Sequence, residues 1–174
     1  MSQRLVQGFA VAMLAFSAAF APGAFAQQQQ PSNAENVDVE EFEDWQVRCP
    51  ENGEQRCEMT QLVNSPESGE PILRIVMGYP PEIDSAAMIL ILPLGTRLSP
   101  GVQFSVDGSE PETFPFQICL QQGCRADFPV DDALRNRMRS GSNAKVSLIG
   151  PRGEQIDLNV SLQGFTDADN RIRR

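Results

Sequence analysis

Four cysteines are the residues whose type and spacing say most about chemistry: Cys49, Cys57, Cys119 and Cys124. Four cysteines allow three pairings. The spacing favours Cys49–Cys57 and Cys119–Cys124, because each pair flanks its own glycine-containing turn. A zinc site would need tighter C-x2-C pairs, and a redox-active pair usually has that spacing at a helix start. We therefore expect two disulfides, each closing a local hairpin, and no metal site.

Histidine is absent from the 174 residues, which removes Ser-His-Asp and Cys-His catalysis and histidine metal sites. No nucleophile elbow, Walker loop or dinucleotide fingerprint occurs. Lys145 is the one lysine, and it lies within a strand pattern. Residues 167–170 match only a fragment of a calcium loop, and with 23 acids no carboxylate pair stands out. We assign no catalytic residue and no cofactor.

The N-terminal residues have the pattern of a secretory signal peptide. Arg4 precedes an apolar stretch that reaches Phe20, and Ala24-Phe25-Ala26 has the small-x-small pattern of a cleavage site. The sequence predicts a signal peptide over residues 1–26, cleaved after Ala26. No later stretch is long and apolar enough to span a membrane. We expect a periplasmic or secreted protein, a compartment in which disulfides form.

Charge is concentrated near the start of the mature chain. The formal net charge is −9, which disfavours a nucleic-acid partner, and six acids lie between Glu35 and Asp44. Such a stretch offers little apolar surface to offset the entropy of ordering it. We predict a disordered polar and acidic linker over residues 27–41, a single domain over 42–170 and a basic C-terminal tail over 171–174.

The domain itself has the alternating pattern of β-strands. Apolar and polar residues alternate from Trp45 to Cys49 and in five further stretches, and residues 86–92 form a continuous apolar run typical of a central strand. Residues 72–77 are apolar on both faces except at Arg74, so that strand is expected to be buried on nearly both. We predict a mainly β fold, either an antiparallel β-sandwich or a barrel-like domain.

One helix interrupts this pattern, near residues 131–140. Val130, Leu134 and Met138 recur at helical spacing, Asp131 can cap the first turn, and Gly141 can form a left-handed stop. Three arginines near its end (Arg135, Arg137 and Arg139) either form a solvated face or a ligand patch.

Several segments in order along the chain resemble the invasion-associated locus B family. They include Trp45-Gln46-Val47-Arg48-Cys49, Cys57-Glu58-Met59-Thr60-Gln61, residues 91–95 and 101–107, Phe116-Gln117-Ile118-Cys119 and residues 160–168. The resemblance covers roughly residues 42–170. It implies a small exported β-rich protein of Gram-negative bacteria. The family offers no agreed catalytic residues to transfer to this chain.

These observations together favour a non-enzymatic exported β-domain of the invasion-associated locus B type that binds a protein partner. Interaction with a host is one role that this hypothesis includes. Two alternatives stay open: an envelope enzyme that uses carboxylates or a metal, and a structural envelope protein. A large exposed apolar patch on the folded surface would favour the partner-binding hypothesis, and a closed cleft with buried carboxylates would favour the enzyme.

Overall fold

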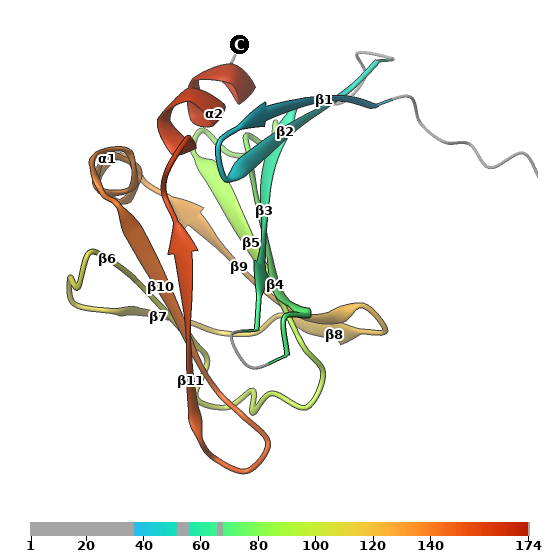
Figure 1. Cartoon of the computed structure of the whole chain (residues 1–174), viewed down its shortest axis with the longest axis vertical. Coiled ribbons are helices and arrows are strands. Elements are labelled where there is room, and N and C mark those ends of the chain that lie inside the picture. The colour runs from blue at the N-terminus through green and yellow to red at the C-terminus, as the bar shows by residue number, and fades with distance from the viewer. Residues whose placement is uncertain (1–36, 52–55, 66–67, 174) are drawn as a thin grey trace, which may run out of the picture. The chain divides into compact units, whose positions relative to one another are not determined.

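Alternating strands form two antiparallel sheets in the computed structural model, which describes residues 37–51, 56–65 and 68–173 (Figure 1). The larger sheet has the strand order β1 (Val37–Phe42), β2 (Trp45–Pro50), β3 (Glu58–Asn64), β4 (Pro71–Gly78), β5 (Ala86–Leu92), β9 (Gly123–Val130) and β8 (Ile118–Leu120). The smaller has the order β11 (Gln155–Ser161), β10 (Asn143–Ile149), β6 (Val102–Val106) and β7 (Glu112–Phe114). The predicted signal peptide, its cleavage site after Ala26 and linker residues 27–36 lie outside the described residues.

The two sheets bury their facing side chains in a common core, so of the two expected architectures the chain adopts the sandwich. Phe128 on the larger sheet stacks on Phe114 of the smaller, with ring centroids 3.7 Å apart, and lies 5.8 Å from Phe104. The run over residues 86–92 is β5, which lies between β4 and β9 and is a central strand as predicted.

Helix α1 (Asp132–Ser140) is the predicted helix. The Asp131 side chain accepts a 2.7 Å hydrogen bond from the Leu134 amide, and Leu134 and Met138 are buried. Gly141 is not left-handed, and on this point the prediction is wrong. A Cβ there would lie 2.8 Å from both Asp107 Oδ2 and Val106 Cγ1, so close approach of these neighbours explains the glycine.

A second helix, α2 (Phe165–Ile172), begins within the predicted domain and extends into the predicted basic tail over residues 171–174. Arg171 is in this helix, and Ile172 is buried in the core. The tail prediction is therefore wrong for these two residues. Trp45 explains the position of α2, because its ring meets the Phe165 ring edge-on with centroids 5.4 Å apart and its indole donates to the Ser161 carbonyl.

Strand β1 corrects the predicted linker, because residues 37–41 pair with β2 along their whole length. Glu40 forms an ion pair of 2.6 Å with Arg171 of α2, and Phe42 packs against the core. The acidic start and the basic end of the domain thus meet. Backbone pairing and this ion pair order a segment whose composition alone indicates a solvated chain.

Candidate functional site

The side of the seven-stranded sheet that faces away from the smaller sheet, here called the outer face, carries an uncovered apolar surface. On β4, Leu73, Ile75 and Met77 point into the core, while Ile72 and Val76 on the opposite face are partly exposed. The prediction that this strand is buried on nearly both faces is therefore wrong for its outer side. Val76, Ile89 and Ile91 are partly exposed and lie outside the buried core.

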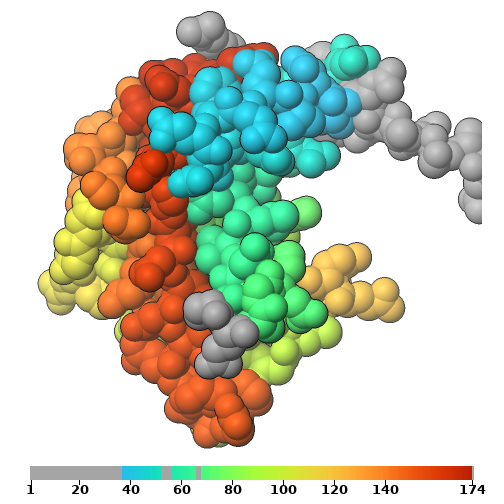
Figure 2. Space-filling view, viewed as in Figure 1, coloured from blue at the N-terminus to red at the C-terminus, as the bar shows by residue number. Residues whose placement is uncertain are grey.

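Three hollows lie along the outer face, with volumes of about 450, 360 and 420 Å³. The first two share Leu62 and Arg74, and the first and third share Glu58 and Val76, so the three form one continuous depression. Figure 2 shows the surface hollowed between the β1–β2 hairpin, in blue, and the projecting β8 hairpin, in light orange. The outer face is therefore concave.

Strand register places a regular row of side chains on the outer face, and its first three members, Leu62, Arg74 and Ile91, line the depression. Adjacent strands pair Leu62 with Arg74, Arg74 with Ile91, Ile91 with Arg125, and Arg125 with Ile118. Because residues opposite one another in a sheet lie on the same face, these five side chains form a line across β3, β4, β5, β9 and β8. Apolar residues and arginines alternate along it. We call this line the arginine row.

A second line of side chains runs parallel to the arginine row, two residues further along each strand. It runs from Thr60 through Val76 and Ile89 to Asp127. Beyond it, Gly78 and Ala87 form a low floor beneath the third hollow. The outer face thus combines an apolar centre with arginines along one side.

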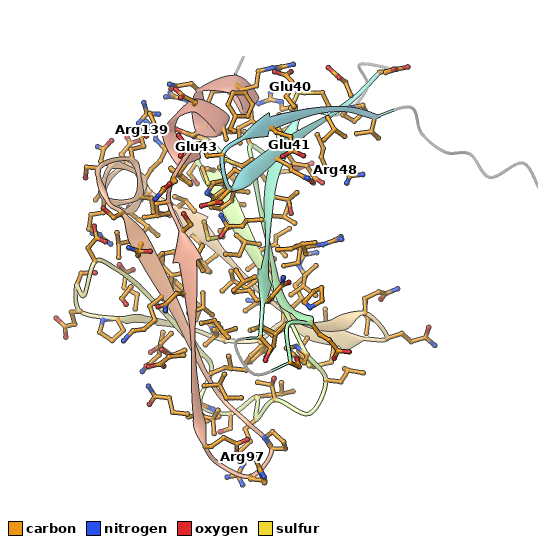
Figure 3. The ribbon with its side chains drawn as sticks, in the orientation of Figure 1. Glu40, Glu41, Glu43, Arg48, Arg97 and Arg139 are labelled. Carbon is orange, nitrogen blue, oxygen red and sulfur yellow. A yellow bond between two sulfur atoms is a disulfide. The ribbon has the colours of Figure 1, made fainter. Side chains whose placement is uncertain are left out.

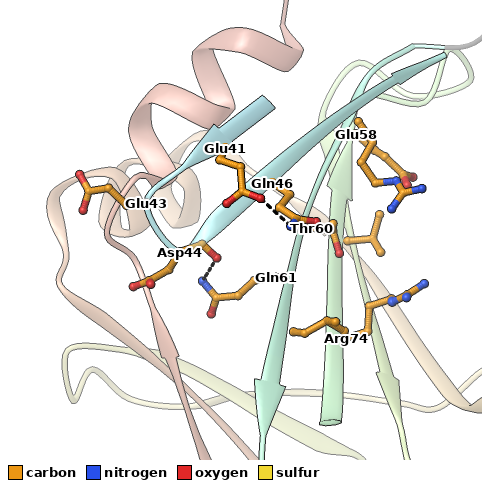
Figure 4. Close-up of a pocket in the computed structure, with 11 residues that line it drawn as sticks. Glu41, Glu43, Asp44, Gln46, Glu58, Thr60, Gln61 and Arg74 are labelled. Atoms are coloured by element: carbon orange, nitrogen blue, oxygen red, sulfur yellow. Dashed lines mark hydrogen bonds between the residues drawn. The ribbon is translucent and has the colours of Figure 1, made fainter. Parts of the chain in front are cut away.

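Acidic side chains also line the first hollow. Figure 4 shows Glu41, Glu43 and Asp44 from the β1–β2 hairpin across the hollow from Arg74, and Glu58 from β3 on the same side as Arg74. We call these four acids the acidic rim. Glu41 also accepts a 3.1 Å hydrogen bond from Gln46, which fixes its position on the hairpin. Figure 3 shows Glu41 and Arg48 on neighbouring strands of this hairpin.

The arginines of the outer face are available for an external carboxylate. Within the described ranges, Arg48 and Arg74 form no ion pair with another side chain. Arg125 forms a 2.9 Å ion pair with Asp127, but its side chain remains 46% exposed. Exposed pairs of this kind contribute little stability, so Arg125 can also bind a second carboxylate.

The disulfides close two loops beside the depression, one between β2 and β3 and one between β8 and β9. Cys49 at the end of β2 is bonded to Cys57, which directly precedes β3, and Cys119 of β8 is bonded to Cys124 of β9. These are the pairs that the spacing favours. In the second hairpin Ile118 and Leu120 are 49% and 57% exposed, an unusual exposure for aliphatic side chains. The second disulfide therefore holds two apolar side chains out from the sheet.

Gly123 allows this hairpin to meet the sheet. Its φ is 139°, and a Cβ on it would lie 2.4 Å from the Leu92 carbonyl oxygen. Only glycine fits so close an approach to the end of β5.

The arginines of α1 do not form a ligand patch, because buried and exposed acids bind them. Arg139 lies 2.6 Å and Arg135 lies 3.7 Å from Oδ2 of Asp169, whose side chain is fully buried, and Arg137 pairs with the exposed Glu112 at 2.7 Å. The Tyr79 hydroxyl donates a 2.7 Å hydrogen bond to Oδ1 of Asp169. These contacts join α1, α2 and the end of β4.

Burial, together with the hydrogen bond to Asp169, raises the pKa of Tyr79 to about 12. Tyr79 therefore stays protonated and donates to Asp169 across the physiological range. Residues 167–170, the calcium-loop fragment, lie in α2, where Asp169 binds arginine instead. In the described segments no three acidic or cysteine side chains gather as a metal site.

The other acids and the lysine considered from the sequence have local roles. Lys145 lies 3.9 Å from Asp157 on the neighbouring strand, and hydrogen bonds from Ser147 and Gln155 lower the pKa of Asp157. Asp107 accepts hydrogen bonds from the amides of Ser142 and Asn143 after α1. No two of these groups lie together in the depression. Neither helix of the described region has the length and apolar character to cross a bilayer.

The geometry defines a class: a small disulfide-bonded β-sandwich with a concave, partly apolar sheet face. The chain belongs to the Invasion associated locus B (IalB) protein family, whose model matches residues 45–173. It is 29% identical over 140 residues to a protein named Invasion protein B homolog from Brucella abortus strain 2308, covering 77% of this chain and 78% of that one. A homolog of the same name from Brucella abortus biovar 1 (strain 9-941) matches equally well.

The fold is also that of a solved member. The crystal structure of invasion associated protein B from Bartonella henselae superposes with a TM-score of 0.69 at 19% identity, covering 78% of this chain and 96% of that one. At this identity the likeness concerns the fold. The family resemblance expected from the sequence is confirmed, and the names of these relatives state invasion and no reaction.

Proposed function

We propose that this chain is an exported, non-enzymatic protein that binds another protein through the outer face of its seven-stranded sheet. The observation that carries the proposal is the partly exposed apolar centre of that face, formed by Val76, Ile89 and Ile91. Apolar side chains on the solvent side of an antiparallel sheet are usually replaced by polar ones. A contiguous apolar patch with a polar border is typical of an interaction site.

The form of the depression supports a macromolecule as the ligand. Sites for small molecules are usually enclosed and hold a few convergent polar groups, whereas these hollows are open and continue into one another. The buried carboxylate of the described region, Asp169, is bound by two arginines and the Tyr79 hydroxyl, and it lines none of the three hollows. The arrangement therefore favours binding over catalysis.

Export is part of the proposal. Residues 1–26 have the pattern of a signal peptide, and the two disulfides fit a chain that folds in an oxidising compartment. The partner would then be met in the periplasm or outside the cell. The names of the relatives make a host-cell surface one setting for this contact.

Site-specific photo-crosslinking in the native bacterium tests the proposal. A photoreactive amino acid replaces Ile89 in the depression, and in a matched control it replaces Leu98, which is 46% exposed in the β5–β6 loop. We expect a discrete protein adduct from position 89 that is absent from position 98. Equal adducts from both positions, or none from position 89, would contradict binding at the outer face.

The export part has its own measurement. Mass spectrometry of the protein from periplasm and culture medium should give a mature N-terminus at Gln27. An uncleaved chain in the cytoplasm would contradict it.

A further inference from the structure

We propose that the outer face binds an amphipathic helix of its partner, with acidic side chains seven residues apart that contact Arg74 and Arg125. This inference rests on the proposed function, because it names the chemistry of the partner at the same face. The juxtaposition that carries it is the arginine row, in which Leu62, Ile91 and Ile118 alternate with the two arginines.

The spacing of the row matches a helix that crosses the strands. Neighbouring strands lie about 4.8 Å apart, so Arg74 and Arg125, two strands apart, are separated by about 10 Å at the backbone. A helix rises about 1.5 Å per residue, and positions seven apart on one face are separated by about 10.5 Å. Residues three or four apart then fall opposite successive members of the row. The helix would place an apolar residue on Ile91 between two acids.

An extended peptide fits the row less well. Side chains on one face of a strand repeat every two residues, or about 6.7 Å, which corresponds to neither one nor two strand spacings of the sheet. The concavity disfavours a flat membrane as the ligand, because the β1–β2 and β8 hairpins project beyond the hollowed surface (Figure 2). The row is about 19 Å long across five strands, a length covered by about thirteen helical residues.

Charge complementarity selects acids for the partner. Arg74 has no ion pair in the described part of this chain, and Arg125 shares only an exposed one. A carboxylate of a partner that approaches either guanidinium can form a charge-assisted, bidentate hydrogen bond. The hairpin acids of the acidic rim, Glu41, Glu43 and Asp44, would repel partner acids placed on their side of the depression. Partner acids are therefore favoured on the flank of the helix that faces the arginine row.

Peptide selection tests this assignment with a defined probe. The mature, oxidised protein is immobilised and a phage-displayed library of random peptides, each about 15 residues long, is selected on it. We expect enriched peptides with an apolar stripe at helical spacing and Asp or Glu seven residues apart. Synthetic copies should become helical by circular dichroism when they bind. Enrichment of peptides without acids, or of peptides that bind in an extended form, would overturn the proposal.

Charge-reversed variants locate the contact. Arg74→Glu should weaken binding of the selected peptides about tenfold in fluorescence anisotropy, which corresponds to one desolvated charge pair. Arg152→Glu is the matched control, because Arg152 is an exposed arginine on the β10–β11 turn. Equal affinity in the Arg74→Glu protein and the unaltered protein would refute the assignment of the acids to the arginine row.

Two further measurements distinguish a partner helix from other ligands of the outer face. Binding of vesicles of anionic phospholipid that Arg74→Glu abolishes would overturn the helix in favour of a lipid surface. A dimer in sedimentation velocity that Arg74→Glu dissociates would overturn it in favour of a second copy of this chain. If the crosslink from position 89 persists while the charge variants bind unchanged, the proposed function stands and the acidic helix does not.

Discussion

Arg139 of α1 donates a 2.6 Å hydrogen bond to Oδ2 of Asp169, a fully buried carboxylate on α2. The same oxygen lies 3.7 Å from Nε of Arg135, and the other oxygen accepts the Tyr79 hydroxyl. Figure 3 shows Arg139 beside the two helices. One acid thus connects two helices with Tyr79, which follows β4 and lines the third hollow of the outer face.

Asp169→Asn should destabilise the fold by about 3 kcal/mol, because removal of one member of a buried ion pair leaves the other charges without a partner. Urea denaturation of the oxidised protein measures this. Asp132→Asn is the control, since Asp132 is an exposed acid that contacts Arg135 at 3.5 Å, and it should change the free energy of unfolding by less than about 0.5 kcal/mol. Equal losses in the two variants would argue against a special role for Asp169.

Tyr79 should titrate near pH 12, and the chain's one tyrosine makes the phenolate absorbance unambiguous. Burial first, and then the hydrogen bond to Asp169, raises the pKa of Tyr79 above its usual value near 10. A raised pKa means that the folded state holds the proton more tightly than the unfolded state does. The stabilisation is therefore complete below about pH 10 and is lost as the pH rises toward 12.

Asp169→Asn removes the acceptor charge, so the pKa of Tyr79 should fall toward its usual value in this variant. An unchanged midpoint there would show that burial alone sets the pKa of Tyr79.

The spacing of apolar residues was sufficient to predict most of the strands and α1, because each of these elements buries one face. Asp131 and Gly141 also mark the ends of α1 in the sequence, although Gly141 is not left-handed. Local cysteine pairs could be chosen from spacing alone, because each lies across one short turn. Local signals give local structure.

Two features depend on contacts between residues distant in the sequence. Strand β1 is stabilised by its pairing with β2 and by the contact of Glu40 with Arg171, which follows it by 131 residues. Asp169 is buried as a charged group because arginines of α1, about 30 residues earlier in the chain, bind its carboxylate. No window of sequence contains both partners, so composition instead indicated a linker and a tail.

The spacing of apolar residues also could not predict that the outer face is exposed. An apolar run such as residues 86–92 has the same pattern whether a second layer covers it or not. The sequence predicted a strand buried on both sides for β4, and only the assembled sheets show that one side has no cover in the described region. The arginine row required the register of five strands, since Arg74 and Arg125 are 51 positions apart.

The second disulfide should contribute to both stability and binding. Replacement of Cys119 and Cys124 together by alanine removes the constraint on a short loop, for which chain entropy predicts a loss of about 2 kcal/mol. It also releases Ile118 and Leu120, which the β8 hairpin holds beside the depression. Peptides selected on the outer face should bind the double variant more weakly.

The matched control is the double replacement of Cys49 and Cys57, whose disulfide closes a loop of similar length between β2 and β3. Denaturation should show a similar loss of stability, while affinity for peptides that contact Ile118 is retained better. If the two double variants lose the same affinity, the β8 hairpin has no separate part in binding.

Gly164→Ala should cost more stability than any other glycine-to-alanine change at a comparable turn. Gly164 precedes α2 with φ 79°, and a Cβ there would lie 1.9 Å from the Phe42 carbonyl oxygen, so β1 and α2 cannot both keep their positions. We expect a loss of about 3 kcal/mol, in which strain from the positive φ accounts for about 1 kcal/mol. Gly95→Ala isolates that strain, because Gly95 has φ 92° and no atom within 4 Å of the added Cβ.

Hydrogen exchange locates the damage. In the Gly164→Ala protein the amides of β1 should lose protection before those of β4 and β5, since the clash separates β1 from α2 while the central strands keep their pairing. The Gly95→Ala protein should keep the protection of β1. Full protection of β1 in the Gly164→Ala protein would mean that α2 moves instead, and the ion pair between Glu40 and Arg171 would then be the contact that is lost.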